Sequence, residues 1–457
     1  MAGIGFELRK LLEKDTFFGI LRAYAYSGLI SSGPWIISIL ALLFLGIFCL
    51  STMSPQIQVT QFQTSVTFLI ATSLIFTGPI QLSYNRFVAD HLYMRHFDKV
   101  LPTFLALMLV MFLVSAAFAS LAMLLFFRNV TFTYCALIVG SFTTLCCVWS
   151  AVVLLAGLKK YKTILAAFML GYGVVIVGGI NLTHYGLNGL LLAFLGGHIV
   201  LLVSIFYAIT HEYHSKQKIS FEFFKIKNTY WTLVLTGLLY NIGLWVDKFI
   251  FWYNPSTSEA VIGPLRYSPI YDFPIFLAYL SIIPGMAVFL VRMETDFVEY
   301  YQKLYHAVLG GGSLSHIREL HAGLVLTARQ GIFEIMKVQA IAILVVLVMG
   351  PTILRYLGIP QLYVHLLNID IVAVGLQVVL LGLLNICFYL DERMHALILT
   401  ATFAILNAAL TQLSMHFGVY FFGYGFAMSL LITVTLGMLL LNHDFKELEY
   451  ETFMLQQ

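Results

Sequence analysis

Long apolar segments separated by short polar stretches repeat along the whole chain. A hydrocarbon core about 30 Å thick needs roughly 20 mostly apolar residues to be crossed by one helix. Twelve segments meet this requirement. The least distinct boundary is "NLTHYGLNG", between the fifth and the sixth segment. The pattern predicts an all-α polytopic membrane protein with about twelve transmembrane helices, at 24–50, 62–84, 100–127, 132–157, 163–182, 187–210, 230–253, 268–291, 332–356, 363–390, 396–416 and 419–441.

Lysine and arginine are unevenly shared between the two sides that these spans define. The side of the N-terminus contains 20 of the 25 Lys and Arg residues, the opposite side contains three, and two lie within spans. Cytoplasmic loops of membrane proteins are enriched in these residues. The distribution therefore predicts that the N-terminus is cytoplasmic. Because the number of spans is even, we expect the C-terminus on the same side.

The basic stretch 211–229 divides the chain into two sets of six spans. We expect two six-helix lobes, 24–210 and 230–441, with 211–229 as a cytoplasmic linker between them. Similar motifs recur at equivalent places, since the second span ends in Arg86-x-x-x-Asp90 and the eighth in Arg292-x-x-x-Asp296. Such recurrence suggests a parallel internal repeat. Chance similarity between apolar helices is the alternative.

Three polar stretches are expected to lie on the cytoplasmic side in addition to the linker. Residues 1–23 have apolar positions at helical spacing and predict an amphipathic helix in the membrane interface. Residues 292–331 form an amphipathic cytoplasmic loop with two helical stretches around "GGGS", which either seals the cytoplasmic mouth or docks a soluble partner. Residues 442–457 form a cytoplasmic tail.

Composition agrees with a membrane protein and argues against most enzymes. The chain of 457 residues is 60% hydrophobic and 10% charged, whereas soluble domains have about 25% charged residues. The net charge of +3 is small and says little about partners, and we expect no nucleic-acid partner. There is no phosphate-binding Gly-x-x-x-x-Gly-Lys-Ser/Thr loop and no His, Cys or carboxylate set at metal-ligand spacing. We expect no enzyme activity, metal or cofactor, and we interpret the five cysteines as core residues.

Ionisable residues within the spans are candidates for function, because each is costly to bury in a membrane. The predicted N-terminal lobe has no Asp, Glu, Lys or Arg inside its spans. The C-terminal lobe has Asp247, Lys248, Asp272 and Asp370 at similar depth in its outer half. We expect the three aspartates to have structural or coupling roles.

Lys248 shares a helical stripe with aromatic and amide side chains. Neighbouring helical residues point about 100° apart, so Lys248 and Asp247 are expected on different faces. Asn241, Trp245 and Trp252 lie at intervals of four, three and four along the stripe of Lys248. An amide, a cation and two indoles suit a hydroxyl-rich ligand such as a sugar.

The stripe also has a simpler interpretation. Trp245 and Trp252 would then belong to the aromatic belt at the outer interface, with Lys248 extending its amine to the headgroups. Tyr240 directly precedes Asn241, lies on the stripe of Asp247, and is a further candidate for substrate binding. Asp247 would serve as a brace, for example toward Arg266.

Prolines within two spans mark candidate hinges. Pro34 follows "SSG" early in the first span, and the eighth span contains Pro269, Pro274 and Pro284. Proline removes a helical hydrogen bond and commonly bends a helix. A helix that is merely bent for packing is equally compatible with the pattern.

The chain resembles the PelG family, inner-membrane transporters of the bacterial Pel exopolysaccharide system. The similarity is specific at "MAGIGFELRKLL", "SSGPW", "GLLYNIGLWVDKFIFW", "YDFPIFLAYLSIIPG", "RMETDFVEYY" and "NICFYLDER", and it extends from end to end. The resemblance implies the multidrug/oligosaccharidyl-lipid/polysaccharide flippase fold and export of an N-acetylhexosamine-rich polymer across the inner membrane for biofilm matrix.

The same resemblance implies partners. These are a cytosolic glycosyltransferase, a membrane regulator that binds cyclic di-GMP and a repeat-rich scaffold protein. A lipid-linked oligosaccharide flippase, an ion-coupled small-molecule antiporter of the same superfamily and a scaffold without transport activity stay open as alternatives.

Overall fold

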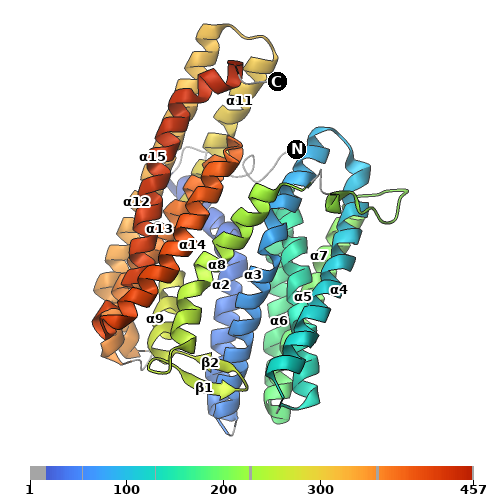
Figure 1. Cartoon of the computed structure of the whole chain (residues 1–457), viewed down its shortest axis with the longest axis vertical. Helices are drawn as coiled ribbons and strands as arrows, with labels where there is room; N and C mark the ends of the chain where they lie inside the picture. Colours follow the sequence, from blue (N-terminus) through green and yellow to red (C-terminus); the bar gives the residue numbers. More distant parts are fainter. Residues whose placement is uncertain (1–16, 54, 129, 226–228, 357–359, 455–457) are drawn as a thin grey trace. The chain divides into compact units, whose positions relative to one another are not determined.

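The computed structural model describes residues 17–454 except 54, 129, 226–228 and 357–359 (Figure 1). Eleven helices in this part of the chain are long and apolar enough to cross a membrane, and a bent pair of helices makes up to twelve. The prediction of about twelve membrane helices is confirmed. Most of the interfacial helix predicted over 1–23 lies outside the described residues, and its last residues form the start of α2 (Phe17–Thr52).

The chain divides into two compact units. The N-terminal unit contains Gly33–Trp245 and Phe251–Pro269. The C-terminal unit contains the residues up to Ser32, the short segment Val246–Ile250 and the chain from Ile270 onward. The unit boundaries therefore fall inside α2 and α8 (Trp231–Tyr253) and at the first residue of α9 (Pro269–Leu280), rather than in a loop.

The N-terminal unit is built around α5, which packs against four neighbouring helices, while α6 and α7 pair with each other. Its helices are apolar around most of their circumference, as expected for helices in lipid. Besides parts of α2 and α8 they are α3 (Ile57–Tyr93), α4 (Val100–Phe126), α5 (Phe132–Gly157), α6 (Tyr161–Asn181) and α7 (Gly186–Glu212).

Two connections of this unit are ordered by specific contacts. The stretch after α8 forms an antiparallel hairpin of β1 (Glu259–Ile262) and β2 (Leu265–Tyr267), which hydropathy did not predict. The linker after α7 is tied down by an ion pair of 3.0 Å between Lys99 and Glu222. Phe223 of the linker is buried next to the ring of Tyr84.

The C-terminal unit is built around α13 (Val364–Tyr389), which packs between α12 (Leu314–Tyr356) and α15 (Tyr424–Met454). The helix α14 (Arg393–His416) packs on α15, and the two run side by side as the orange and red helices of Figure 1. Residues 292–331 are helical in most of their length. They comprise a π-helical segment Arg292–Phe297, α11 (Val298–Leu309) and the first turns of α12.

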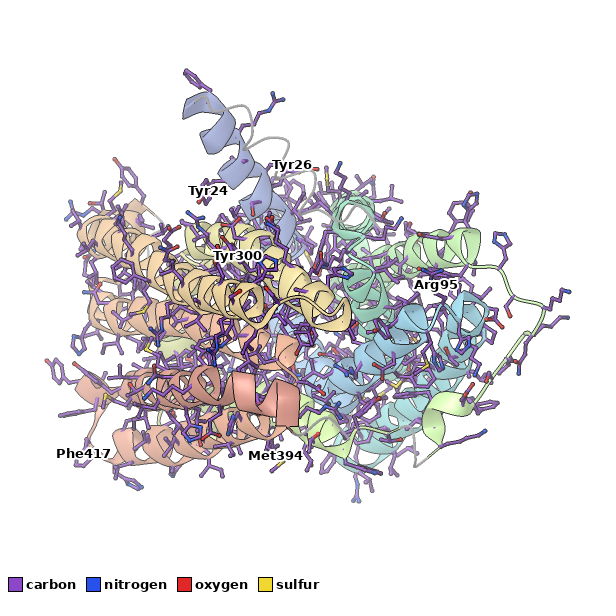
Figure 2. All side chains as sticks on the ribbon, turned by 90° about the horizontal axis from the view of Figure 1, so that it is seen from above. Tyr24, Tyr26, Arg95, Tyr300, Met394 and Phe417 are labelled. Carbon is purple, nitrogen blue, oxygen red and sulfur yellow. The ribbon has the colours of Figure 1, made fainter. Side chains whose placement is uncertain are left out.

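The helix α12 is too long to lie within the bilayer. With 43 residues it extends about 65 Å, roughly twice the thickness of the hydrocarbon core. Its first half pairs with α11 as an antiparallel hairpin. Tyr300 of α11 lies against α12 (Figure 2), where a Cβ on Gly323 would be 2.5 Å from its ring. The hairpin is therefore closely packed.

The eighth predicted span consists of two helices, α9 (Pro269–Leu280) and α10 (Ile283–Val291), bent by 41°. Pro284 stands in the first turn of α10, directly after the break. The break frees backbone acceptors, and the buried Gln339 of α12 donates its amide to the carbonyl of Ser281 at 3.1 Å. Pro269 begins α9, and Pro274 lies inside it.

The motifs that suggested an internal repeat have similar local structures. Arg86 pairs with Asp90 at 3.0 Å and Arg292 pairs with Asp296 at 2.6 Å, each one helical turn apart. The charged turns after α5 and α13 each contain a residue with positive φ, Lys159 at 58° and Asp391 at 64°.

Candidate functional site

Asp247 and Lys248 of α8 form a buried ion pair. Their Oδ2 and Nζ atoms are 3.0 Å apart, and the side chains are 0% and 5% exposed. The expectation that the two side chains diverge is wrong. Although their Cβ atoms point to different faces, the four-carbon stem of Lys248 is long enough to return its amine to the adjacent carboxylate.

Two helices of the C-terminal unit, α9 and α14, supply the hydrogen bonds around Asp247. The Tyr271 hydroxyl of α9 donates to Oδ2 at 2.6 Å. The Asn407 amide of α14 donates to Oδ1 at 3.3 Å. The Thr411 hydroxyl donates in turn to the Asn407 side-chain oxygen at 3.0 Å. Asp247 is thus held by a cation and two neutral donors, which is how a buried carboxylate is stabilised.

Aromatic rings surround the Lys248 amine on its other sides. Nζ lies 4.8 Å from the ring centre of Phe426 and 5.5 Å from that of Tyr279. The negative faces of such rings attract a desolvated cation. Tyr279 itself donates to the Gln377 side-chain oxygen at 3.2 Å, so its position is fixed by α13.

Asp370 of α13 completes this group, which we call the buried polar cluster: Asp247, Lys248, Tyr271, Asp370, Asn407 and Thr411. Asp370 is fully buried and lies within electrostatic range of Lys248 and Asp247. Among the described residues, neither of its carboxylate oxygens has a hydrogen-bond partner. A Cβ on Gly423 would lie 3.0 Å from Oδ1. The cluster thus contains two carboxylates and only one amine.

The other residues of the predicted sugar-binding stripe belong to the N-terminal unit. Trp252 is buried, stacks on Phe68 at 4.5 Å and has the Trp245 ring 6.3 Å away. The Asn241 amide donates to the carbonyl of Gly237 in its own helix at 2.9 Å. Sugar binding by this stripe stays a prediction.

Three other residues considered in the sequence analysis are not members of the buried polar cluster. Tyr240 and Asp272 are both half-buried. Arg266, suggested as the partner of Asp247, instead donates to the Trp252 carbonyl at 3.2 Å and to Ser258 at 2.9 Å. It ties the β-hairpin to the end of α8.

The sequence analysis missed three members of the buried polar cluster, Tyr271, Asn407 and Thr411. An asparagine within the apolar run "TFAILNAAL" was a usable signal, since a buried amide needs a partner. Tyr271 was overlooked because Asp272 is the ionisable neighbour. Which of the two faces Asp247 depends on the rotation of α9, which the sequence alone does not determine.

A second polar group ties α14 to α15 in the C-terminal unit. His395 Nδ1 lies 3.1 Å from Asp444 and 3.5 Å from Glu392. Their donor atoms lie within 4.8 Å of one another, a geometry that could hold a metal ion. The sequence analysis found no such set, because 49 residues separate His395 from Asp444.

The fold is shared with transporters of the MOP superfamily. An outward-facing multidrug resistance MATE family transporter matches with a TM-score of 0.68 and 14% identity, over 93% of this chain and 96% of that one. A MOP superfamily transporter from Pyrococcus furiosus Vc1 matches with a TM-score of 0.62, the same identity and the same coverage. A Vibrio cholerae MATE transporter matches with a TM-score of 0.60 and 13% identity, over 93% of this chain and 98% of that one.

No curated protein matches the chain. The family model of PelG, described as an exopolysaccharide exporter (EPS-E), matches residues 1–453. That match covers nearly the whole chain, and the transporter fold agrees with it. The chain therefore belongs to the PelG family of exopolysaccharide exporters, and it is a membrane transporter rather than an enzyme.

Proposed function

We propose that this protein exports a Pel-like, N-acetylhexosamine-rich exopolysaccharide across the bacterial inner membrane for the biofilm matrix. Membership of the PelG family and the transporter fold support the export of an exopolysaccharide. The distribution of Lys and Arg supports cytoplasmic termini, so that polymer enters from the side of its glycosyltransferase. A regulator that binds cyclic di-GMP and a repeat-rich scaffold protein are proposed as further partners.

The observation that carries the energetic part of this proposal is the carboxylate of Asp370. A buried ionised carboxylate without hydrogen bonds is costly, and it becomes neutral by binding a proton or a cation. Lys248 is already paired with Asp247, so it offsets the charge of Asp370 only in part. We propose that binding and release of one cation at Asp370 drives transport, with Asp247 and Lys248 as a permanent pair.

The proposed transport cycle also requires segments that bend. Pro34 lies next to the unit boundary between Ser32 and Gly33, and Pro284 lies at the 41° break between α9 and α10. These are the best supported hinges. We propose smaller hinge contributions from Pro269 and Pro274, and we place sugar contacts on Asn241, Trp245 and Tyr240.

The test is polymer export in a strain whose only copy of the gene encodes Asp370→Asn. The variant keeps the shape of the side chain but removes the titrating group, so secreted polymer should fall to the level of a gene deletion at normal membrane abundance. Asp391→Asn is the matched control, because Asp391 lies in an exposed turn paired with Arg393 at 2.7 Å. Normal secretion by the deletion strain would refute export, and normal secretion by Asp370→Asn would refute the coupling role alone.

An ion-coupled antiporter for small molecules is the second candidate, since the unpaired Asp370 would serve such a protein equally. Gradient-driven uptake of organic cations into vesicles, with no change in secreted polymer on gene deletion, would favour it. A flippase for lipid-linked oligosaccharides is the third. It predicts that the lipid-linked precursor accumulates on the cytoplasmic leaflet of the deletion strain.

A further inference from the structure

The N-terminal unit contains a pocket of about 570 Å³ at one end of its helices. Parts of α3, α4, α5, α7 and the β-hairpin surround it, so residues distant in sequence meet there. The volume lies within the range of about 300–1,000 Å³ typical of ligand sites. Its polar lining residues are Gln58, Gln61, Arg128, Thr131, Asn188 and the tyrosines 134 and 185.

Three helices begin at this pocket, namely α3, α5 and α7. Thr131 caps α5, accepting from the backbone N–H of Tyr134 at 3.4 Å. The residues before α3 and α7 make no side-chain cap hydrogen bond. The first N–H groups of a helix have no partner within the helix, and they attract electronegative atoms. At the start of α3, however, the N–H groups of Gln58 and Val59 already donate to the carbonyls of Pro55 and Gln56, and the N–H of Gly186 at the start of α7 donates to Thr183. Donors for a ligand in this pocket therefore come from side chains.

Polar side chains at the pocket are available for a ligand. Within the described part of the chain, the side chains of Gln58, Arg128 and Asn188 make no hydrogen bond or ion pair with one another or with other residues. Gly186 has φ of +63°, and a Cβ there would lie 2.4 Å from the Gln58 side-chain oxygen. The glycine leaves the space that the Gln58 amide occupies beside the start of α7.

Among the described residues, the remaining lining is aromatic and apolar, and none of it is acidic. Phe126, Phe127 and Tyr185 contribute rings at the rim, and the ring of Phe127 closely approaches the hairpin turn at Gly263. Rings stack on the C–H faces of sugars, while amide and guanidinium groups bond to hydroxyl and acetamido oxygens. With Arg128 in the lining and no carboxylate to balance it, the pocket disfavours a cationic ligand.

We propose that this pocket binds a short segment of a neutral N-acetylhexosamine polymer, as a second sugar site separate from the stripe on α8. The inference rests on the proposed function. Arg128 lies in a connection that the Lys and Arg distribution places outside, so the pocket would receive polymer on the exit side of the membrane. Arg128 and Asn188 bond to the acetamido and hydroxyl oxygens, and Tyr185 covers a sugar face.

The test is calorimetric titration of the purified full chain in lipid nanodiscs with short oligomers of N-acetylglucosamine. Arg128→Ala should raise Kd roughly ten- to hundredfold, as expected for the loss of a charged donor, and Asn188→Ala roughly three- to tenfold. Arg128→Gln is the conservative second variant. Matched controls are Arg355→Ala, in an exposed turn at the end of α12, and Asn181→Ala, whose amide bonds within α6 at 2.7 Å.

The titrations either support or overturn sugar binding at the pocket. Weakened binding in the pocket variants, with both controls unchanged, supports the site. Equal binding in all variants, or absence of binding by the wild type, overturns it. A parallel titration with inorganic phosphate tests the alternative of a lipid headgroup, and binding of phosphate without sugar also overturns it. If gene deletion abolishes secretion while Arg128→Ala binds sugar normally, this site fails and the proposed function stands.

Discussion

Replacing Lys248 by Met should destabilise the C-terminal unit strongly. The side chains have similar length, so the substitution removes the charge with little change of volume. Lys248 is only 4% exposed, and Asp247 and Asp370 are fully buried. The variant would therefore leave two carboxylates in the protein interior without a cation.

The size of the effect follows from the 3.0 Å separation of the pair. At an effective dielectric constant near 20, the attraction between unit charges at that distance is about 5–6 kcal/mol. The donors Tyr271 and Asn407 still stabilise Asp247 in the variant. We expect a net loss of about 3–5 kcal/mol, the usual cost of removing one partner of a buried ion pair.

The free energy of unfolding in mixed micelles, measured from the denaturant midpoint and slope, checks this value. The double variant Asp247→Asn with Lys248→Met should lose less than Lys248→Met alone, because both charges leave together. Lys303→Met is the control. The Lys303 side chain is 54% exposed, and its amine pairs with Glu299. Lys303→Met should therefore lower the free energy of unfolding by less than about 1 kcal/mol. If Lys248→Met costs no more than this control, the description of the cluster as a stabilising ion pair is refuted.

Other substitutions test separate parts of the fold. Gly186→Ala should destabilise by about 1–3 kcal/mol through its positive φ, whereas Gly196→Ala, in open space inside α7, should stabilise by about 0.5–1 kcal/mol, both read from thermal midpoints. Gln339→Leu should cost about 1–3 kcal/mol in a denaturant titration, because it leaves the carbonyl at the helix break unpaired. The hydrogen bond from Lys99 holds the pKa of Glu222 below its usual value, so its contribution is present above about pH 4.3 and lost as the pH falls through the lowered pKa of the folded state. Both side chains are partly exposed, so the pair contributes less than about 1 kcal/mol to the free energy of unfolding. Glu222→Gln should remove this contribution, so melting temperatures measured against pH should fall less steeply on the acid side than in the wild type.

The sequence by itself determined the membrane helices. Hydropathy is a local property, and a bilayer imposes one length on every span, so the predicted 132–157 is observed as Phe132–Gly157 and 230–253 as Trp231–Tyr253. The charged members of the buried polar cluster, Asp247, Lys248 and Asp370, were also found from the sequence, because ionisable residues are rare inside apolar spans. The bend of the eighth span was predicted from its prolines.

Only the tertiary structure decided which polar groups meet. Helical periodicity separated Asp247 from Lys248, yet the flexible lysine stem joined them, since the low dielectric of the interior favours a pair over two isolated charges. The contacts of Asp247 with Tyr271 and Asn407 depend on how α9 and α14 are rotated about their axes. The pocket at Arg128 likewise exists because three helix starts and a hairpin converge. The rotation of each helix and its contacts with distant elements depend on packing across the whole unit. A short stretch of sequence does not contain that information.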